Sequence, residues 1–96
     1  MKALYSRAIR ATASGVVINR PTRVTNFTVN AVDADCIVNL RDGGAVGPIL
    51  WTLEADNAAS SPTICFEAGL NFERNVYMEF VTGGAQSSAC IAVLEP

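Results

Sequence analysis

The chain has 96 residues, of which 50% are apolar and 17% charged, with a net charge of −2 and no histidine. This length fits one small domain and excludes two. The missing histidine excludes the usual zinc ligand and every Ser/His or Cys/His nucleophile pair. Because a domain of this size has little interior, the high apolar share predicts that part of it lies at contacts with other subunits or with a partner.

The first eleven residues fit two patterns. A helical stripe and an interrupted strand alternation overlap there, the first at Met1, Leu4, Tyr5, Ala8 and Ile9 and the second at Ala3, Tyr5, Ile9 and Ala11. We predict a strand or an extended arm. Every later element is predicted to be a strand, and a single helix of eleven residues is marginal without packing.

Residues 22–30 and 35–55 have the strongest strand patterns. Residues 22–30 are rich in β-branched side chains, and their alternation breaks near Thr25 and Asn26, which predicts a bulge. Residues 35–41 and 48–55 each alternate, and a glycine-rich segment separates them. We therefore predict a β-hairpin over 35–55 with its turn at residues 42–47.

Further strands are predicted in the C-terminal third. Proline suits the first residue of a strand, so a strand is expected over 62–67. Gly69 marks the next turn, and strands over 72–82 and 87–94 follow. The predicted fold class is all-β, a small antiparallel β-sandwich or jelly-roll-like domain of six to eight strands.

Charge is unevenly distributed along this single predicted domain, 1–96. Residues 1–23 hold five basic and no acidic residues, or +5, whereas 24–96 hold two basic and nine acidic residues, or −7, which sums to −2. We expect a basic N-terminal arm or strand over 1–21 and a core over 22–96. Such an arm is either a solvated tail or a contact with an acidic neighbouring subunit. Its candidate interface residues are Lys2, Arg7, Arg10, Arg20 and Arg23.

The single tryptophan, Trp51, stands close to the glycine-rich turn of the predicted hairpin. A large aromatic residue in an alternating strand is most often part of the core. We therefore expect Trp51 in the core, and the alternative is an anchor at a protein interface.

Three cysteines lie in apolar runs without the spacing of metal ligands, so we expect free, buried thiols at Cys36, Cys65 and Cys90. That state fits a reducing cytoplasm.

Two acidic pairs lack the pattern of a calcium loop and are expected to be solvated turn residues, Asp33 with Asp35 and Glu54 with Asp56. A glycosidase-type carboxylate pair is the one catalytic alternative. We predict no catalytic residue, metal or cofactor, and hence no enzyme.

The N-terminus has no secretory signal pattern, and no apolar run approaches the length of a membrane span. We therefore expect neither secretion nor membrane insertion. The acidic total argues against a dedicated nucleic-acid-binding domain.

Three segments together carry a resemblance to a known group. They are the opening MKALY, the run VNLRDGG that leads through Gly47 into ILWTL, and the GLNF element at 69–72. The chain resembles small virion proteins of tailed bacteriophages, particularly aquatic phages, from residue 1 to about residue 94. The resemblance implies a β-sandwich or jelly-roll-like fold that binds protein and performs no catalysis. The three cysteines depart from the pattern of such relatives.

The resemblance also implies a function. The chain is expected to be a capsid decoration or cement protein that binds the head shell as a homo-oligomer, with a trimer favoured, and stabilises it. The expected partners are further copies and the phage major capsid protein, without nucleic acid or membrane. The expected location is the capsid surface, after assembly in the host cytoplasm. The alternatives are a tail or baseplate adaptor and a carbohydrate-binding module on the virion surface.

Overall fold

The computed structural model describes residues 5–32, 34–56, 61–83 and 87–95. In these ranges the chain forms eight strands and no helix: β1 (Tyr5–Ala11), β2 (Gly15–Ile18), β3 (Thr22–Asn30), β4 (Cys36–Asp42), β5 (Ile49–Ala55), β6 (Thr63–Phe72), β7 (Val76–Thr82) and β8 (Ser88–Glu95). None of the described segments is therefore a helix that could cross a membrane. The all-β prediction is confirmed.

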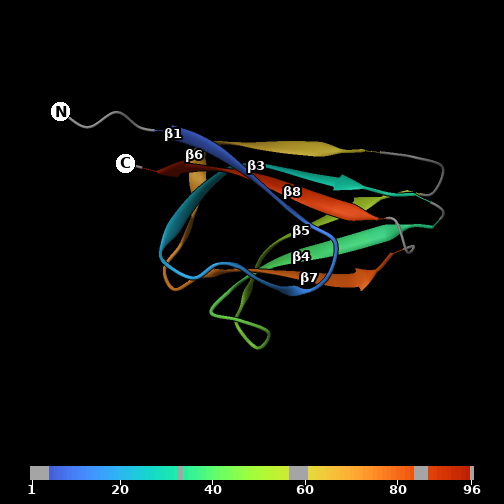
Figure 1. Cartoon of the computed structure of the whole chain (residues 1–96), viewed down its shortest axis with the longest axis horizontal. Coiled ribbons are helices and arrows are strands. Elements are labelled where there is room, and N and C mark those ends of the chain that lie inside the picture. Colours follow the sequence, from blue (N-terminus) through green and yellow to red (C-terminus); the bar gives the residue numbers. More distant parts are fainter. Residues whose placement is uncertain (1–4, 33, 57–60, 84–86, 96) are drawn as a thin grey trace.

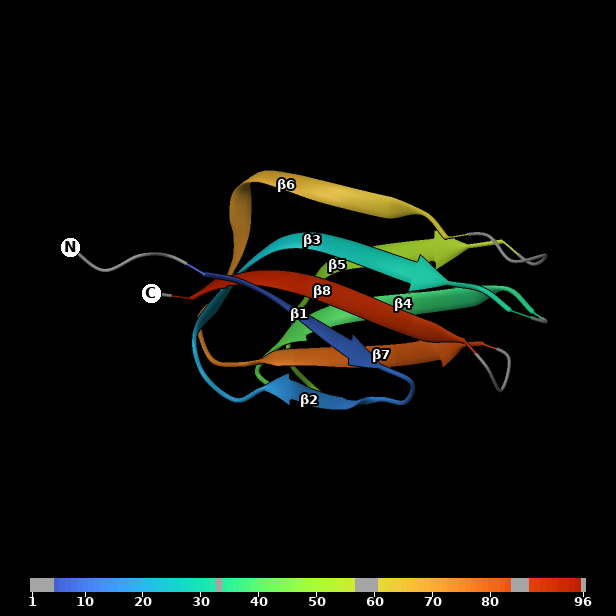
Figure 2. The same ribbon diagram turned by 45° about the horizontal axis from the view of Figure 1, so that its top comes forward.

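The strands form two antiparallel four-stranded sheets, ordered β1-β8-β3-β6 and β2-β7-β4-β5. Figures 1 and 2 show one sheet lying over the other as a sandwich. The pairs β1–β8, β2–β7, β3–β6 and β4–β5 are nested, as in one long antiparallel ribbon. Rolling this ribbon also pairs β3 with β8 and β4 with β7. Eight strands in this order make a jelly roll.

The tip of the ribbon is the predicted hairpin. β4 and β5 pair from Cys36 with Ala55 to Arg41 with Ile49, so the hairpin over 35–55 is confirmed. At the other end of the ribbon, β1 pairs along its whole length with β8. Residues 5–11 therefore form a strand, as predicted, and not a helix. β2, which no sequence pattern indicated, pairs with β7.

The core lies between the two sheets and comes mainly from the four central strands. Alternate residues of β3, β8, β4 and β7 point inward, and they supply most of the fully buried apolar side chains, among them Val24, Phe27, Val29, Val38, Leu40, Val76, Met78, Ile91 and Val93. Among the described side chains of the four edge strands, only Ile18, Ala55 and Phe72 are buried apolar residues. Apolar residues on the edge strands are therefore mostly left partly exposed.

β3 and β6 carry the bulge that the sequence predicted near Thr25. The register with both β6 and β8 shifts between Val24 and Asn26. On β6, Asn26 pairs with Cys65 and Val24 with Leu70, so residues 66–69 lie opposite the single residue Thr25. The chain bends there, as Figure 2 shows. The predicted turn at Gly69 is wrong, because β6 continues through it to Phe72.

Gly69 is part of this bulge. Its φ is +85°, and a Cβ at this position would collide with the Cγ of Arg23. Glycine tolerates both conditions because it has no side chain. The same residue that indicated a turn in the sequence therefore allows a strand to bend without ending.

Candidate functional site

The sandwich has two open sides, where edge strands of the two sheets face each other. One is bordered by β1 and β2 and the other by β5 and β6. Edge strands expose unpaired backbone groups and partly buried side chains, so they are the usual places for contact with another chain. We name these the β1/β2 side and the β5/β6 side.

The β5/β6 side exposes two large apolar residues of β5. Ile49 is 46% exposed and Trp51 is 38% exposed. The Trp51 ring lies edge-on against Phe66 of β6, with ring centroids 5.1 Å apart and planes at 82°. Residues 49–52 line a shallow, open hollow of about 360 Å³. The expectation that Trp51 lies in the core is wrong, because β5 is an edge strand that its neighbours cover on one side only.

The turn before β5 fixes where this strand begins. Gly43 and Gly44 have φ values of +101° and +94°, which glycine adopts at no steric cost. The N–H of Gly47 donates to the carbonyl of Gly44, and the N–H of Asp42 donates to the carbonyl of Pro48, both at 3.0 Å. These bonds close the turn and start β5 opposite Arg41.

The side chain of Asp42 joins this turn to the one between β6 and β7. Its carboxylate accepts from the N–H groups of Glu73 and Arg74 at 2.9 Å and of Asn75 at 3.4 Å. Partial burial acts to raise the pKa of Asp42, but these three donors and the charge of Arg74 outweigh it and lower the pKa. Ionised Asp42 thus holds the two turns together.

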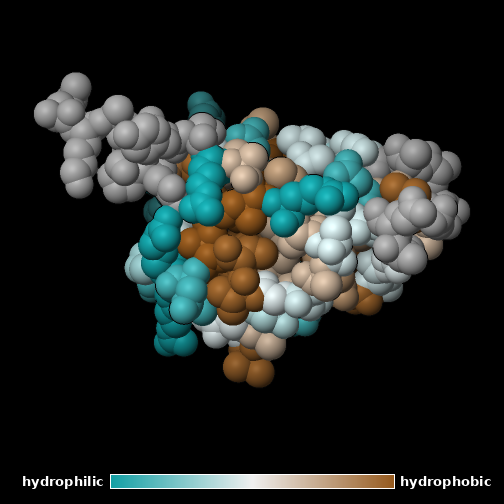
Figure 3. Space-filling model, viewed as in Figure 1, coloured by the Kyte–Doolittle hydropathy of each residue, from teal (hydrophilic) through white to brown (hydrophobic). Residues whose placement is uncertain are grey.

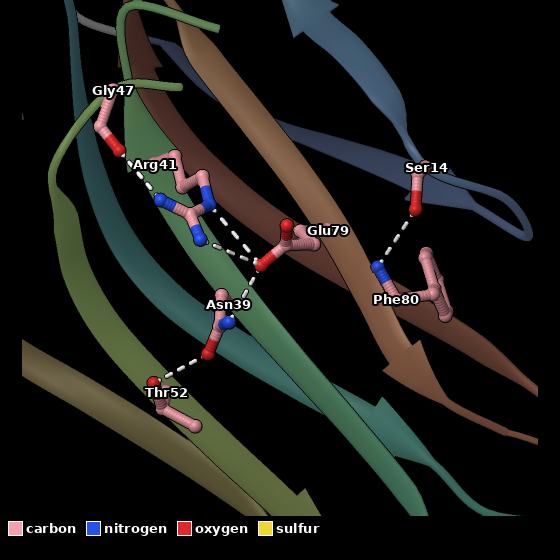
Figure 4. A network of polar contacts seen from close by, with 7 residues as sticks. All are labelled: Ser14, Asn39, Arg41, Gly47, Thr52, Glu79 and Phe80. Carbon is pink, nitrogen blue, oxygen red and sulfur yellow. Dashed lines mark hydrogen bonds and ion pairs between the residues drawn. The ribbon is translucent and has the colours of Figure 1, made fainter. Parts of the chain in front are cut away.

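A polar cluster occupies the outer face of the β2-β7-β4-β5 sheet (Figure 4). The Oε1 atom of Glu79 accepts from the Asn39 amide at 2.8 Å and from the Arg41 Nε at 3.1 Å, and it also pairs with Arg41 Nη2 at 3.1 Å. Arg41 Nη1 donates to the Gly47 carbonyl at 2.7 Å, and Thr52 Oγ1 donates to Asn39 Oδ1 at 2.5 Å. The cluster therefore links β7, β4, β5 and the 42–47 turn.

The side chains of this cluster bond mainly to one another. Asn39 is only 7% exposed although it points away from the core, and its amide uses both ends for neighbours. The Asn39 amide and then the Arg41 guanidinium lower the pKa of Glu79, against a smaller effect of burial. With Arg41 and Glu79 paired to each other, the face positions β5 and does not present an isolated catalytic acid or base.

The β1/β2 side has a different surface. Ile9, Ala11 and Val17 are half-buried there, and apolar surface gathers between β1 and β2, bordered by hydrophilic residues (Figure 3). Arg7 and Arg10 are exposed on β1. Arg7 pairs with the core residue Val93 and Arg10 with Cys90 on the outer face, so the two arginines border this side on opposite faces of the sheet.

The other predicted basic residues lie at one end of the sandwich. Arg20 is exposed in the β2–β3 loop, and exposed Arg23 donates from Nε to Asn71 Oδ1 at 3.3 Å. Arg74 lies in the nearby β6–β7 turn against Gly43. Val46, at the tip of the hairpin on the same end, is 96% exposed. We name this surface the basic end. Lys2 lies outside the described residues.

The predicted cysteine and acidic sites have mixed outcomes. All three cysteines are free, and Cys36 is buried, with a raised pKa because of that burial, opposed by a hydrogen bond with Ser87. Cys65 is exposed on edge strand β6, so its predicted burial is wrong, and Cys90 is half-buried.

Glu54, Asp35 and Asp56 are exposed, and Asp33 lies outside the described residues. Within the described ranges, no group of three potential metal ligands comes together.

Comparisons with known proteins give no identification. No family model matches the chain, and neither a curated protein nor a solved structure does so.

The strand patterns in the sequence did not reveal the polar cluster, although they indicated which of its residues share a strand face. The alternation of 35–41 places Asn39 and Arg41 on one face, and that of 72–82 places Glu79 with Tyr77. The register then sets Asn39 opposite Glu79. Alternation along one strand cannot show which residue lies across from it in the next strand. A search for opposite charges on paired outer faces could have found Arg41 and Glu79, but only with the strand order known.

Proposed function

We propose that this chain is a structural protein of a tailed-bacteriophage virion, a decoration protein that binds the head shell as a homo-oligomer and stabilises it. The phage assignment comes from the sequence resemblance. The jelly roll supports it by analogy, because viral capsid domains are among the proteins that use this fold. The observation that carries the protein-binding role is the exposed apolar surface of β5, Ile49 and Trp51, on an edge strand.

The basic end is the surface that we assign to the shell. It combines the exposed Arg20, Arg23 and Arg74 with Val46 at the hairpin tip. Nearby, the Asp42 carboxylate is already engaged by backbone donors. An acidic shell surface would be attracted by the arginines, and the apolar tip would bury its surface on contact. Binding only to the assembled shell would stabilise that shell by mass action.

The test is cosedimentation of the purified protein with empty heads of its phage. We expect saturable binding that R20E/R23E lowers by about tenfold or more, while thermal unfolding and self-association stay as in the wild-type protein. Glu73, exposed at the same end, offers the control E73Q, which removes one negative charge and should bind heads at least as well as the wild type. Absence of binding to heads, or binding that ignores R20E/R23E, would contradict this function.

A second candidate is a carbohydrate-binding module on the virion surface, and the exposed Trp51 beside a shallow hollow favours it. Aromatic faces next to polar groups are common in sugar sites, and Thr52 lines the same hollow. Tryptophan fluorescence during titration with glycans tests this candidate, because only a sugar platform at Trp51 would give a saturable shift. Binding to tail or baseplate assemblies instead of heads would favour the adaptor alternative.

A further inference from the structure

The charges on the edge strands separate completely between the two open sides. In the described residues of these four strands, the β1/β2 side has two basic residues, Arg7 and Arg10 of β1. The β5/β6 side has two acidic residues, Glu54 of β5 and Glu67 of β6. All four side chains are exposed. Opposite sides of one molecule therefore carry opposite charge.

Strand direction makes the two sides compatible in both layers. Each sheet has four strands, all antiparallel. The first and last strands of such a sheet run in opposite directions, β1 against β6 and β2 against β5. A second copy placed beside the first in the same orientation therefore sets β1 antiparallel to β6 and β2 antiparallel to β5. This arrangement continues the pattern of both sheets.

Both sides also have apolar surface to bury. The β1/β2 side presents exposed Val16 with the half-buried Ile9 and Val17. The β5/β6 side presents Ile49 and Trp51. Apolar surface with charged residues at its border is the usual composition of a protein interface.

We propose that the chain self-associates side by side, with the β1/β2 side of one copy packed against the β5/β6 side of the next. This would be the self-contact of the proposed decoration protein, and only its biological purpose rests on that proposed function. In the layer that β1 and β6 share, Arg7 of one copy faces Glu67 of its neighbour. Arg10 on β1 and Glu54 on β5 belong to different layers, so they add opposite charge to the two sides without forming a direct pair.

The strand register supports the pair of Arg7 with Glu67. Across β8 and β3, Arg7 is level with Leu70 and Ala8 is level with Cys65. Glu67 lies between Cys65 and Leu70 on β6, so it is at the same level as Arg7.

Charge decides against the two-fold alternative. Pairing two β5/β6 sides would bring only acidic edge residues together, and pairing two β1/β2 sides would bring only basic ones together. Like charges across an interface are repulsive. A head-to-tail contact instead leaves one side of each kind free for a further copy, and it closes into a ring only when each copy is rotated against the last by the required angle.

Charge reversal tests the contact in purified protein without heads. We expect R7E/R10E and E54R/E67R each to raise the dissociation constant of self-association by about tenfold or more, as measured by sedimentation velocity and light scattering over a concentration series. The variant with all four changes restores opposite charges, so its dissociation constant should return to within about threefold of the wild type. Raised salt should weaken wild-type association.

Thermal unfolding and circular dichroism show whether each variant is folded, and E73R, in the β6–β7 turn at the basic end, is the single charge-reversal control. A wild-type protein that stays monomeric, reversals that associate normally, or four changes that fail to restore association would overturn the inference. So would a two-fold dimer. Head binding is measured separately through R20E/R23E, so loss of one property leaves the other interpretable.

Discussion

The two open sides of the sandwich are alike in strand architecture and differ in charge and in aromatic content. Each is bordered by one edge strand from each sheet. Apart from Tyr5 at the start of β1, the β1/β2 side has small and β-branched residues with two arginines, whereas the β5/β6 side has Trp51, Phe66 and two glutamates. This difference teaches that edge strands in a small sandwich can be specialised separately, because the four central strands alone supply most of the core.

The largest effect on stability should come from the core that both sides share. Phe27 is fully buried at the centre of β3, so Phe27→Ala should lower the free energy of unfolding by about 3–5 kcal/mol. Urea denaturation at low protein concentration measures it. A loss below about 1 kcal/mol would show that the two sides do not depend on this common core.

The next effect distinguishes the backbones of the two sides. Gly69→Ala should cost about 1–2 kcal/mol, because its φ is +85° and Arg23 occupies the space of a Cβ. Gly15, at the start of β2, is the matched control, since a Cβ there meets nothing within 4 Å. Gly15→Ala should be neutral or slightly stabilising in the same denaturation experiment. Equal costs at both positions would contradict a bend specific to β6.

An effect of similar size distinguishes the side chains of the two sides. Trp51→Ala should lower the free energy of unfolding by about 1–2 kcal/mol, because the residue is partly exposed but loses its edge contact with Phe66. Val16→Ala on the other side should change it by less than about 0.5 kcal/mol. If Val16→Ala proved the costlier change, the β1/β2 side would be the better packed of the two.

The smallest predicted effect is the pH dependence of stability. The pKa values of Asp42 and Glu79 are lowered in the folded chain, so each stabilises the fold when ionised. That stabilisation is complete above a pH of about 4, which is the ordinary carboxyl pKa. It is lost as the pH falls through the lowered pKa values of the folded chain. Thermal unfolding from pH 6 to pH 2 measures it. Asp42→Asn should flatten the acid side of the curve, and an unchanged slope would exclude Asp42 as a cause.

Much of the fold could be predicted from the sequence, because strand alternation has a period of two and is local. Residues 35–55 show this most directly, since the glycine turn and the two alternating strands predicted the hairpin correctly. The bulge near Thr25 was visible as a break in the same alternation. β2 could not be found in this way, because four residues are too few to show a period.

The sequence by itself determined the fold class and the hairpin, because each depends on neighbouring residues. The tertiary structure decided which strands became edges. That choice left Trp51 and Cys65 exposed, brought Asn39 and Arg41 to Glu79, and placed the basic and acidic edge residues on opposite sides. Strand order depends on contacts between distant residues, so no pattern within a single strand contains it.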